Sequence, residues 1–233
     1  KSEASRPRCF FCGERGAYAE MAVERYFDGA AVSEHVDSFD EIFQGVVDGR
    51  ADFGMVPIEN STAGAVYNNY DNLARFEDIS IVGAITLRIE HSLLAPKGAT
   101  LDTIKNVYSH PQGLAQTSNF LKSYKWNQID TISTASGAKF VAEKGIPENA
   151  AVANARNAEI YGLEILRQGI ENNPNNYTRF VIIAANHVAA NSGDYDFSAS
   201  GNVASVTNSV QKPNMATFMF STKDEAGALY NAL

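Results

Sequence analysis

Short apolar runs separated by polar turns follow one another along most of the chain. β-Branched and aromatic residues dominate these runs, and glycine, serine, threonine or asparagine follows most of them. This pattern is typical of strands that lead into turns. We therefore expect strands at residues 9–12, 51–58, 79–87, 92–95, 106–108, 129–132, 150–153, 163–166 and from 178 onwards.

Helical spacing of apolar residues lies between several of these expected strands. The clearest case begins after Ser38, which forms a capping box with Glu41, and ends at Gly49. Pro111 occupies a first helical position and marks another start. We expect helices at residues 18–26, 39–47, an irregular one near 68–71, and further ones from 111, at 138–143 and at 156–161.

The recurring order of strand, polar turn and helix predicts an α/β fold. Residues 87–176 form their own α/β pattern between 8–86 and 177–188, so we expect two lobes joined by two crossings. Residues 88–91 are a candidate hinge, in which His91 is either a ligand contact or, as we favour, a polar residue at a strand edge. A ligand is expected between the lobes, outside the carboxyl ends of the strands.

Composition narrows the classes of partner. The chain has 233 residues, 45% of them apolar and 20% charged, which is ordinary for a globular protein. Its net charge of −8 argues against nucleic acid, and no apolar run approaches the length of a membrane span. We expect a cytoplasmic protein. Residues 189–211, rich in alanine, serine, asparagine and glycine, are an expected linker.

The two cysteines, Cys9 and Cys12, stand in a Cys-x-x-Cys spacing. Such a pair suggests redox chemistry or half of a zinc site. Within a strand, however, positions three apart point to opposite faces. Free thiols are therefore the favoured interpretation, and no metal is expected.

Two polar turns carry the candidate chemistry. In the turn at 57–64, small hydroxyl and amide residues follow a strand, an arrangement that suits an anion. Glu59 in that turn is either a carboxylate favoured by a helix dipole or an acid tuned for proton transfer. The second turn, 172–176, leads into Thr178 and Arg179, a hydroxyl and a planar cation at a strand start.

Five motifs resemble those of the prephenate dehydratase family and occur in that family's order. They cover the chain from Cys9 to about Ala185. Cys12 stands where the family usually has glutamine, and Ala19 where it often has serine. The motifs are Gly13-Glu14-Arg15-Gly16-Ala17-Tyr18, Pro57-Ile58-Glu59-Asn60-Ser61-Thr62-Ala63-Gly64, Asn69-Tyr70-Asp71, Ser109-His110-Pro111-Gln112 and Thr178-Arg179-Phe180.

The resemblance implies a two-lobed fold like that of the type II periplasmic binding proteins, with the active site in the cleft between the lobes. It implies the conversion of prephenate, a dianion, to phenylpyruvate, water and carbon dioxide in phenylalanine biosynthesis, without a cofactor. It also implies a homo-oligomer, a dimer or a tetramer. The two alternatives are an arogenate dehydratase and a non-catalytic solute-binding module of the same fold.

The resemblance also implies a set of site residues. Thr178 is the candidate proton donor, either directly or as a relay to Glu59 or water, and Arg179 is the candidate grip for a substrate carboxylate. The implied catalytic residues are Thr178, Glu59, Asn60 and Gln112. The implied substrate-binding residues are Arg179, Phe180, Ser61, Thr62, Gly64, Tyr18, Ser109, His110, Thr134 and Ser136.

The last residues, 212–233, resemble the beginning of an ACT regulatory domain. Gly227, Ala228 and Leu229 match a turn that binds phenylalanine in such domains. This segment holds only a strand and part of a helix, which is too little apolar surface for an independent fold. We expect an incomplete regulatory domain, a monofunctional chain and weak or absent inhibition by L-phenylalanine.

Overall fold

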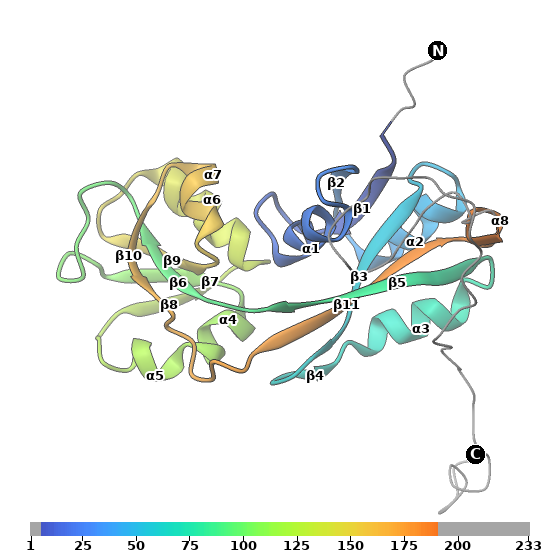
Figure 1. Cartoon of the computed structure of the whole chain (residues 1–233). Coiled ribbons are helices and arrows are strands. Elements are labelled where there is room, and N and C mark those ends of the chain that lie inside the picture. Colours follow the sequence, from blue (N-terminus) through green and yellow to red (C-terminus); the bar gives the residue numbers. More distant parts are fainter. Residues whose placement is uncertain (1–5, 191–233) are drawn as a thin grey trace, which may run out of the picture.

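The computed structural model of the chain describes residues 6–190. Most of the expected linker and the whole of the expected regulatory segment, including Gly227, Ala228 and Leu229, lie outside this range. The described chain forms two sheets, each covered by helices and lying side by side along the long axis of the molecule (Figure 1). The expected two-lobed α/β fold is therefore confirmed.

The sheet of the first lobe has six strands. Its order is β2-β1-β3-β11-β5, with β4 paired to β3; β1 runs parallel to β2 and β3, and β11 runs antiparallel to β3 and β5. Its strands are β1 (Arg8–Cys12), β2 (Val32–Val36), β3 (Phe53–Asn60), β4 (Gly64–Ala65), β5 (Ile79–Arg88) and β11 (Tyr177–Ala185). Its helices are α1 (Tyr18–Phe27), α2 (Phe39–Val47), α3 (Tyr67–Arg75) and α8 (Asn186–Ala190).

The central strands of this sheet are buried on both faces. Phe11, Met55 and Ile182 pack with α1 in one core cluster, whereas Val56 and Ile183 pack with α2 in another. Successive side chains of a strand point to opposite faces, so a strand with helices on both sides must be apolar throughout. The continuous apolar runs of β3 and β11 have this cause.

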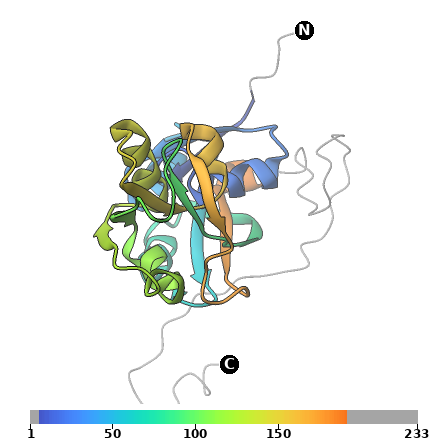
Figure 2. The same ribbon diagram turned by 90° about the vertical axis from the view of Figure 1, so that its left-hand side faces the viewer.

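The sheet of the second lobe has five strands in the order β10-β6-β9-β7-β8. Core clusters on its two faces include residues of α4 and α5 on one side and of α6 and α7 on the other (Figures 1 and 2). The strands are β6 (Ser92–Ala95), β7 (Asn106–Ser109), β8 (Asn127–Asp130), β9 (Asn149–Ala153) and β10 (Glu164–Gln168). The helices are α4 (Pro111–Gln116), α5 (Ser118–Leu121), α6 (Thr134–Lys144) and α7 (Arg156–Tyr161).

The chain passes between the sheets twice, after β5 and before β11, and these two long strands run side by side (Figure 1). The crossings are tied together by backbone hydrogen bonds from Ile89 N to Asn176 O (2.7 Å) and from Ile170 N to His91 O (3.1 Å). His91, expected as a polar residue at a strand edge, directly precedes β6 and is buried, with 1% of its surface exposed.

Several element predictions differ from the structure; the expected strand 51–58, for example, is β3 at Phe53–Asn60. The sequence analysis missed β2, an edge strand whose mostly polar residues offer no apolar alternation. Helix α6 begins four residues earlier than expected, because the turn-like residues before 138 form a capping box between Ser133 and Ser136. Strand β8 lies two residues before the expected 129–132.

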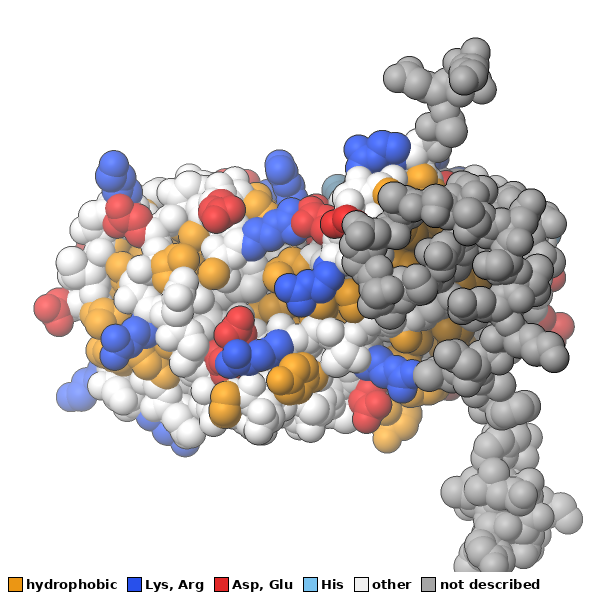
Figure 3. Space-filling view, viewed as in Figure 1, with side chains coloured by type: hydrophobic (Ala, Val, Ile, Leu, Met, Phe, Trp, Pro, Cys, Tyr) orange, Lys and Arg blue, Asp and Glu red, His pale blue; other side chains and the backbone are white. Residues whose placement is uncertain are grey.

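The surface of the described chain offers no continuous basic region on the face drawn in Figure 3, where acidic and basic side chains are interspersed. No helix within residues 6–190 is long and apolar enough to cross a membrane. In the same range, no group of three histidine, cysteine, aspartate or glutamate side chains is placed to hold a metal ion.

Candidate active site

Turns after strands of one sheet contact turns after strands of the other. Gly16, after β1, accepts hydrogen bonds from Asn154 and Asn157, after β9. Thr62, after β3, accepts one from Gln116 on α4. In α/β sheets, ligands bind outside the carboxyl ends of strands, so this seam between the lobes is the candidate site.

Asn60, the last residue of β3, organises the centre of the seam. It is 7% exposed. Its side-chain Oδ1 accepts from Thr62 N (3.0 Å), Thr62 Oγ1 (2.7 Å) and Ala63 N (2.9 Å). Its Nδ2 donates to Asn176 Oδ1 (2.9 Å), Tyr177 O (3.1 Å) and Thr178 Oγ1 (2.9 Å). Asn60 therefore ties the turn after β3 to the start of β11.

Thr178 lies directly opposite Asn60 in the antiparallel ladder of β11 and β3, and opposite Leu87 on its other side. Because Asn60 Nδ2 donates to Thr178 Oγ1, the hydroxyl keeps its own proton for another acceptor. Thr178 is half-buried. The predicted pair Asn60 and Thr178 is thus brought together by one cross-strand register.

Gln116 completes this group, which we call the amide cluster: Asn60, Thr62, Gln116, Asn176 and Thr178. Gln116 Nε2 donates to Thr62 Oγ1 (2.8 Å), and Asn60 Oδ1 lies 3.5 Å away. The sequence analysis chose Gln112 instead, whose recorded hydrogen bond is its backbone N–H to His110 Nδ1 (3.1 Å). The signal for Gln116 was its place one helical turn after Gln112.

Glu59 and Arg179 pair opposite each other in the same ladder, one position from Asn60 and Thr178. Adjacent residues of a strand point to opposite faces. Glu59 and Arg179, both exposed, therefore lie on the other face of the sheet from the amide cluster. The register does not support a proton relay from Glu59 to Thr178.

The second lobe contributes hydroxyl groups that are mostly engaged. Ser109 is fully buried, and its Oγ donates to Val152 O (2.6 Å). His110 caps α4, and burial lowers the pKa of its imidazole. Ser136 Oγ donates to Ser133 O (2.8 Å) inside the capping box. Thr134 is half-buried in the first turn of α6.

The other predicted contacts have different environments. Phe180 is 3% exposed and packs in the core with α1, so we do not retain it as a substrate contact. Ser61 closes the turn, since its Oγ donates to Asn175 O (3.0 Å) and accepts from Tyr177 N (2.9 Å). Gly64 is exposed. Tyr18 Oη donates to Glu90 O (2.5 Å), beside His91.

A second contact between the lobes surrounds the turn after β1. Asn154 Nδ2 and Asn157 Nδ2 donate to Gly16 O at 2.7 and 3.0 Å. Lys139 Nζ lies 3.0 Å from Glu14 Oε2, and Arg156 pairs with Glu24. We call this group of residues on α1, its preceding turn, α6 and α7 the clasp.

Both cysteines lie on β1, the strand that leads into the same turn. Cys9 is fully buried, and burial raises the pKa of its thiol. Cys12, half-buried at the end of β1, also has a raised pKa, chiefly because of burial. Both thiols are free. Free thiols are what the sequence analysis favoured.

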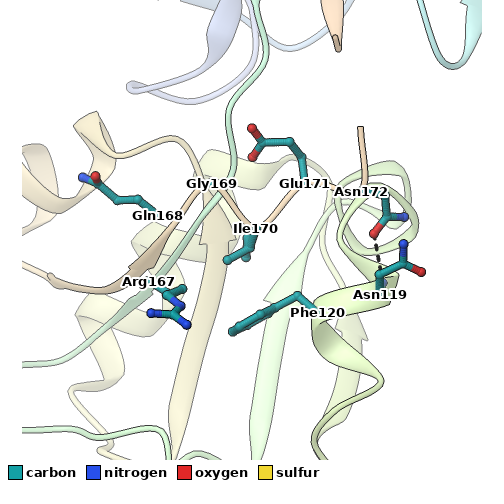
Figure 4. A pocket seen from close by; sticks show the side chains of 8 residues that line it. All are labelled: Asn119, Phe120, Arg167, Gln168, Gly169, Ile170, Glu171 and Asn172. Carbon is teal, nitrogen blue, oxygen red and sulfur yellow. Dashed lines mark hydrogen bonds between the residues drawn. The ribbon is translucent and has the colours of Figure 1, made fainter. Parts of the chain in front are cut away.

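A hollow of about 370 Å³ lies elsewhere on the second lobe, between α5 and the loop that follows β10. Figure 4 shows Phe120 and Arg167 lining it, while the carboxylate of Glu171 points away. None of its lining residues belongs to the amide cluster, although Asn172 N donates to Gln116 O (2.7 Å), so we do not assign it to the candidate site.

Curated proteins similar to the chain include dehydratases of two substrates. Arogenate dehydratase 2 of Petunia hybrida is 34% identical over all of this chain and 54% of its own length. The bifunctional chorismate mutase/prephenate dehydratase of Escherichia coli is 35% identical over 97% of this chain and 55% of its own length. The chain spans about half the length of these relatives.

Solved structures similar to the chain include a prephenate dehydratase and a protein titled as an acylase. A prephenate dehydratase from Arthrobacter aurescens in complex with L-Phe has a TM-score of 0.71 and 27% identity, over 76% of this chain and 60% of that one. A structure titled GqqA, a novel type of quorum quenching acylases, has a TM-score of 0.70 and 34% identity, over 76% and 64%. The family model for prephenate dehydratase matches residues 9–188, and the chain belongs to the prephenate dehydratase family.

Proposed function

We propose that the chain catalyses the decarboxylating dehydration of prephenate to phenylpyruvate in L-phenylalanine biosynthesis. The observation that carries this proposal is the amide cluster, in which Asn60 donates to the hydroxyl oxygen of Thr178 at the seam between the lobes. Family membership and the prephenate dehydratases among the relatives support the same reaction. No cofactor is proposed.

The reaction needs a general acid. Prephenate loses its ring carboxylate as carbon dioxide, the electron pair of that C–C bond enters the ring, and the C–O bond on the far side of the ring breaks. The departing hydroxyl takes a proton and leaves as water, so the ring becomes aromatic. Proton donation to such a leaving group contributes roughly 10²–10⁴-fold.

Thr178 is the proposed donor. A threonine hydroxyl is a weak acid, so its oxygen needs stabilisation as the proton leaves. Asn60 Nδ2, 2.9 Å from Thr178 Oγ1, supplies a fixed donor for that developing charge. Water returns the proton after turnover.

Uncharged donors suit this substrate. The ring carboxylate loses its charge in the transition state, so a strong cation beside it would stabilise the ground state more than the transition state. The amide cluster consists of amides and hydroxyls only. We propose Thr62, Gln116, Thr134 and Tyr18 as further substrate contacts, and Arg179 as a contact only if the substrate reaches the opposite face of the sheet.

The test measures kcat/KM of the chain on prephenate, as phenylpyruvate formed, and on arogenate, as phenylalanine formed. The Petunia relative makes arogenate the second candidate substrate. Thr178→Val keeps the shape of the side chain and removes the hydroxyl, and we expect kcat to fall roughly 10²–10⁴-fold on the preferred substrate. Thr86→Val, an exposed threonine on the neighbouring strand β5, is the matched control and should be near wild type.

A third assay, besides those on prephenate and arogenate, addresses the acylase among the structural relatives. It supplies an acyl amide and measures the amine released. Amide hydrolysis without turnover of prephenate or arogenate would contradict the proposal, as would binding of prephenate without product, which would indicate a solute-binding module.

We also propose the lobe division 8–86 with 177–188 and 87–176, supported by the two separate sheets, although β5 carries the first sheet on to Arg88. L-phenylalanine is the proposed effector, supported by the Arthrobacter structure in complex with L-Phe. A cytoplasmic location and a dimer or tetramer remain proposals of the family resemblance. A sedimentation measurement with and without L-phenylalanine tests the oligomeric state and the effect of L-phenylalanine together.

A further inference from the structure

His91 lies at the crossing from the first lobe to the second, between β5 and β6, and is buried. Its main chain is fixed by the returning crossing: its N–H donates to Glu171 Oε2 (3.1 Å), and its carbonyl accepts from Ile170 N (3.1 Å). Its ring lies between two side chains, with Nε2 2.9 Å from Gln116 Oε1 and Nδ1 3.2 Å from Tyr18 Oη. Gln116 belongs to the amide cluster, so His91 contacts the cluster through Gln116.

The direction of each hydrogen bond in the amide cluster follows from two backbone donors. Thr62 N and Ala63 N both point at one atom of the Asn60 amide, which must therefore be its oxygen. Thr62 Oγ1 lies 2.7 Å from that oxygen and must donate to it. Its proton is then committed, so the hydroxyl oxygen of Thr62 is left as an acceptor.

Gln116 has no choice of orientation as a result. The atom that faces Thr62 Oγ1 at 2.8 Å must be the amide nitrogen, and the atom that faces His91 must be the oxygen. An amide oxygen only accepts. His91 Nε2 must therefore carry a proton.

The other side of the ring does not oppose this assignment. Burial lowers the pKa of His91, so one ring nitrogen carries a proton in the neutral ring. With the proton on Nε2, Nδ1 is an acceptor. The Tyr18 hydroxyl has two acceptors within reach, Glu90 O at 2.5 Å and His91 Nδ1 at 3.2 Å, and it can rotate toward either. The backbone N–H groups of Thr62 and Ala63, which fix the orientation of Gln116 through Asn60, cannot rotate in this way.

We propose that His91 is a positioning residue, whose Nε2–H holds the Gln116 amide so that its NH₂ group faces Thr62 and Asn60. Its effect on catalysis rests on the proposed function, since it acts through Gln116 on the pair Asn60 and Thr178. Loss of the Nε2 donor frees the Gln116 amide to turn, and a turned amide presents an oxygen to Thr62 in place of a donor.

The first experiment reads the tautomer and needs no turnover. The chain has four histidines, so ¹⁵N-histidine labelling gives four ring spectra, and the one lost in His91→Gln belongs to His91. Long-range ¹H–¹⁵N correlation at about pH 8, where the free imidazole is neutral, reports which nitrogen is protonated. We expect the proton on Nε2 in the wild type. A proton on Nδ1 with a bare Nε2 would overturn the proposal.

The second experiment uses two amides that place a donor differently. The amide nitrogen of His91→Gln reaches the region of Nε2, whereas that of His91→Asn reaches the region of Nδ1. With prephenate as substrate, we expect His91→Gln to stay near wild type and His91→Asn to lose kcat by roughly tenfold to hundredfold with little change in KM. Melting temperatures of the two variants should agree.

Equal kinetics of the two variants would overturn the positioning role, because a merely structural histidine would not distinguish the two amides. If the wild type turns over neither prephenate nor arogenate, the proposed function fails, and the tautomer measurement still decides the hydrogen-bond assignment. Failure of the positioning role of His91 is therefore distinguishable from failure of the proposed function.

Discussion

The two lobes meet in two regions of opposite chemistry. In the amide cluster, the contacts are short, directional and uncharged, and they connect Asn60, Thr62 and Thr178 to Gln116. In the clasp, two ion pairs with partly exposed side chains flank the amides that bind Gly16 O. The first region is beside the crossings, whereas the second joins α1 and its preceding turn to α6 and α7.

The difference assigns different tasks to the two regions. Asn60 and Asn176, the two amides at the centre of the cluster, are buried, and buried amides tolerate few arrangements, so the cluster fixes the geometry of Thr178. Exposed ion pairs are weak and screened by salt. The ion pairs of the clasp therefore suit a contact that opens and closes, whereas its buried amides and the amide cluster suit contacts that keep their shape. The predictions below separate the two regions, beginning with the largest effect.

Asn60→Ala should damage both stability and turnover. The variant leaves the oxygen of Thr178 without its donor and the backbone N–H groups of Thr62 and Ala63 without their acceptor. We expect a loss of about 1–3 kcal/mol in the free energy of unfolding. We also expect kcat on prephenate to fall roughly 10²–10³-fold.

Asn69→Ala is the control for that variant. Asn69 is also buried, and its Nδ2 donates to Pro57 O (2.7 Å) outside the amide cluster. It should lose stability by denaturant unfolding while its kcat stays near wild type. Equal loss of kcat in the two variants would mean that Asn60 acts through the fold alone.

Gly16→Ala should break the clasp. Gly16 has a φ of 90°, and a Cβ there would lie 2.4 Å from Asn157 Oδ1 and 3.2 Å from Ile160 Cδ1. Backbone strain of this kind costs about 1–3 kcal/mol before the clash is counted. Gly29→Ala has a φ of 72° with open space around the Cβ, so it carries the strain alone. The difference between their unfolding free energies measures the clasp contact, and no difference would contradict it.

Acidification should weaken the region around His91. Burial is the main cause of its lowered pKa, opposed by the Gln116 hydrogen bond and by Glu171; Glu90 and Arg88 also lie at this crossing. The unfolded chain binds a proton at about pH 6.5, above the folded pKa, so this contribution to stability is full above that pH and falls as pH falls.

His91→Gln removes that group from the titration. Melting temperatures measured from about pH 8 to pH 5 should therefore fall less steeply in the variant than in the wild type. His110, whose pKa burial also lowers, remains in both and accounts for part of the residual slope. Identical slopes would contradict the burial of a neutral His91.

Arg156→Met should have the smallest effect. The pair Arg156 and Glu24 is partly exposed, so after solvent screening its contribution is at most ~1 kcal/mol. We expect a small fall in melting temperature at low salt that disappears at high salt. A salt-independent fall would indicate lost packing of the arginine stem instead.

The sequence predicted the fold well because β3, β11 and α2 carry their own signals. Buried strands need continuous apolar runs, and the serine cap of α2 accepts from Glu41 N as the capping box requires. β2 had no such signal, because an edge strand with exposed polar residues buries little. Local pattern therefore predicts elements that pack on both faces better than elements at a sheet edge.

The site was predicted less completely, because side-chain direction depends on register. The motif around Glu59 and Asn60 is one stretch of sequence, but the ladder sends the two side chains to opposite faces. Gln116 lies one helical turn beyond the motif that drew attention to Gln112. The burial of His91 depends on how the crossings tie to each other, and short stretches of sequence do not carry that information.

The account's central claim is that Asn60 and Thr178 act as one unit in proton transfer. A double-mutant cycle of Asn60→Ala and Thr178→Val, measured as kcat on prephenate, tests it most directly. If Asn60 acts by supporting the Thr178 oxygen, the double variant should be no slower than Thr178→Val alone, because the support has nothing left to hold. Losses that multiply in the double variant would contradict the claim.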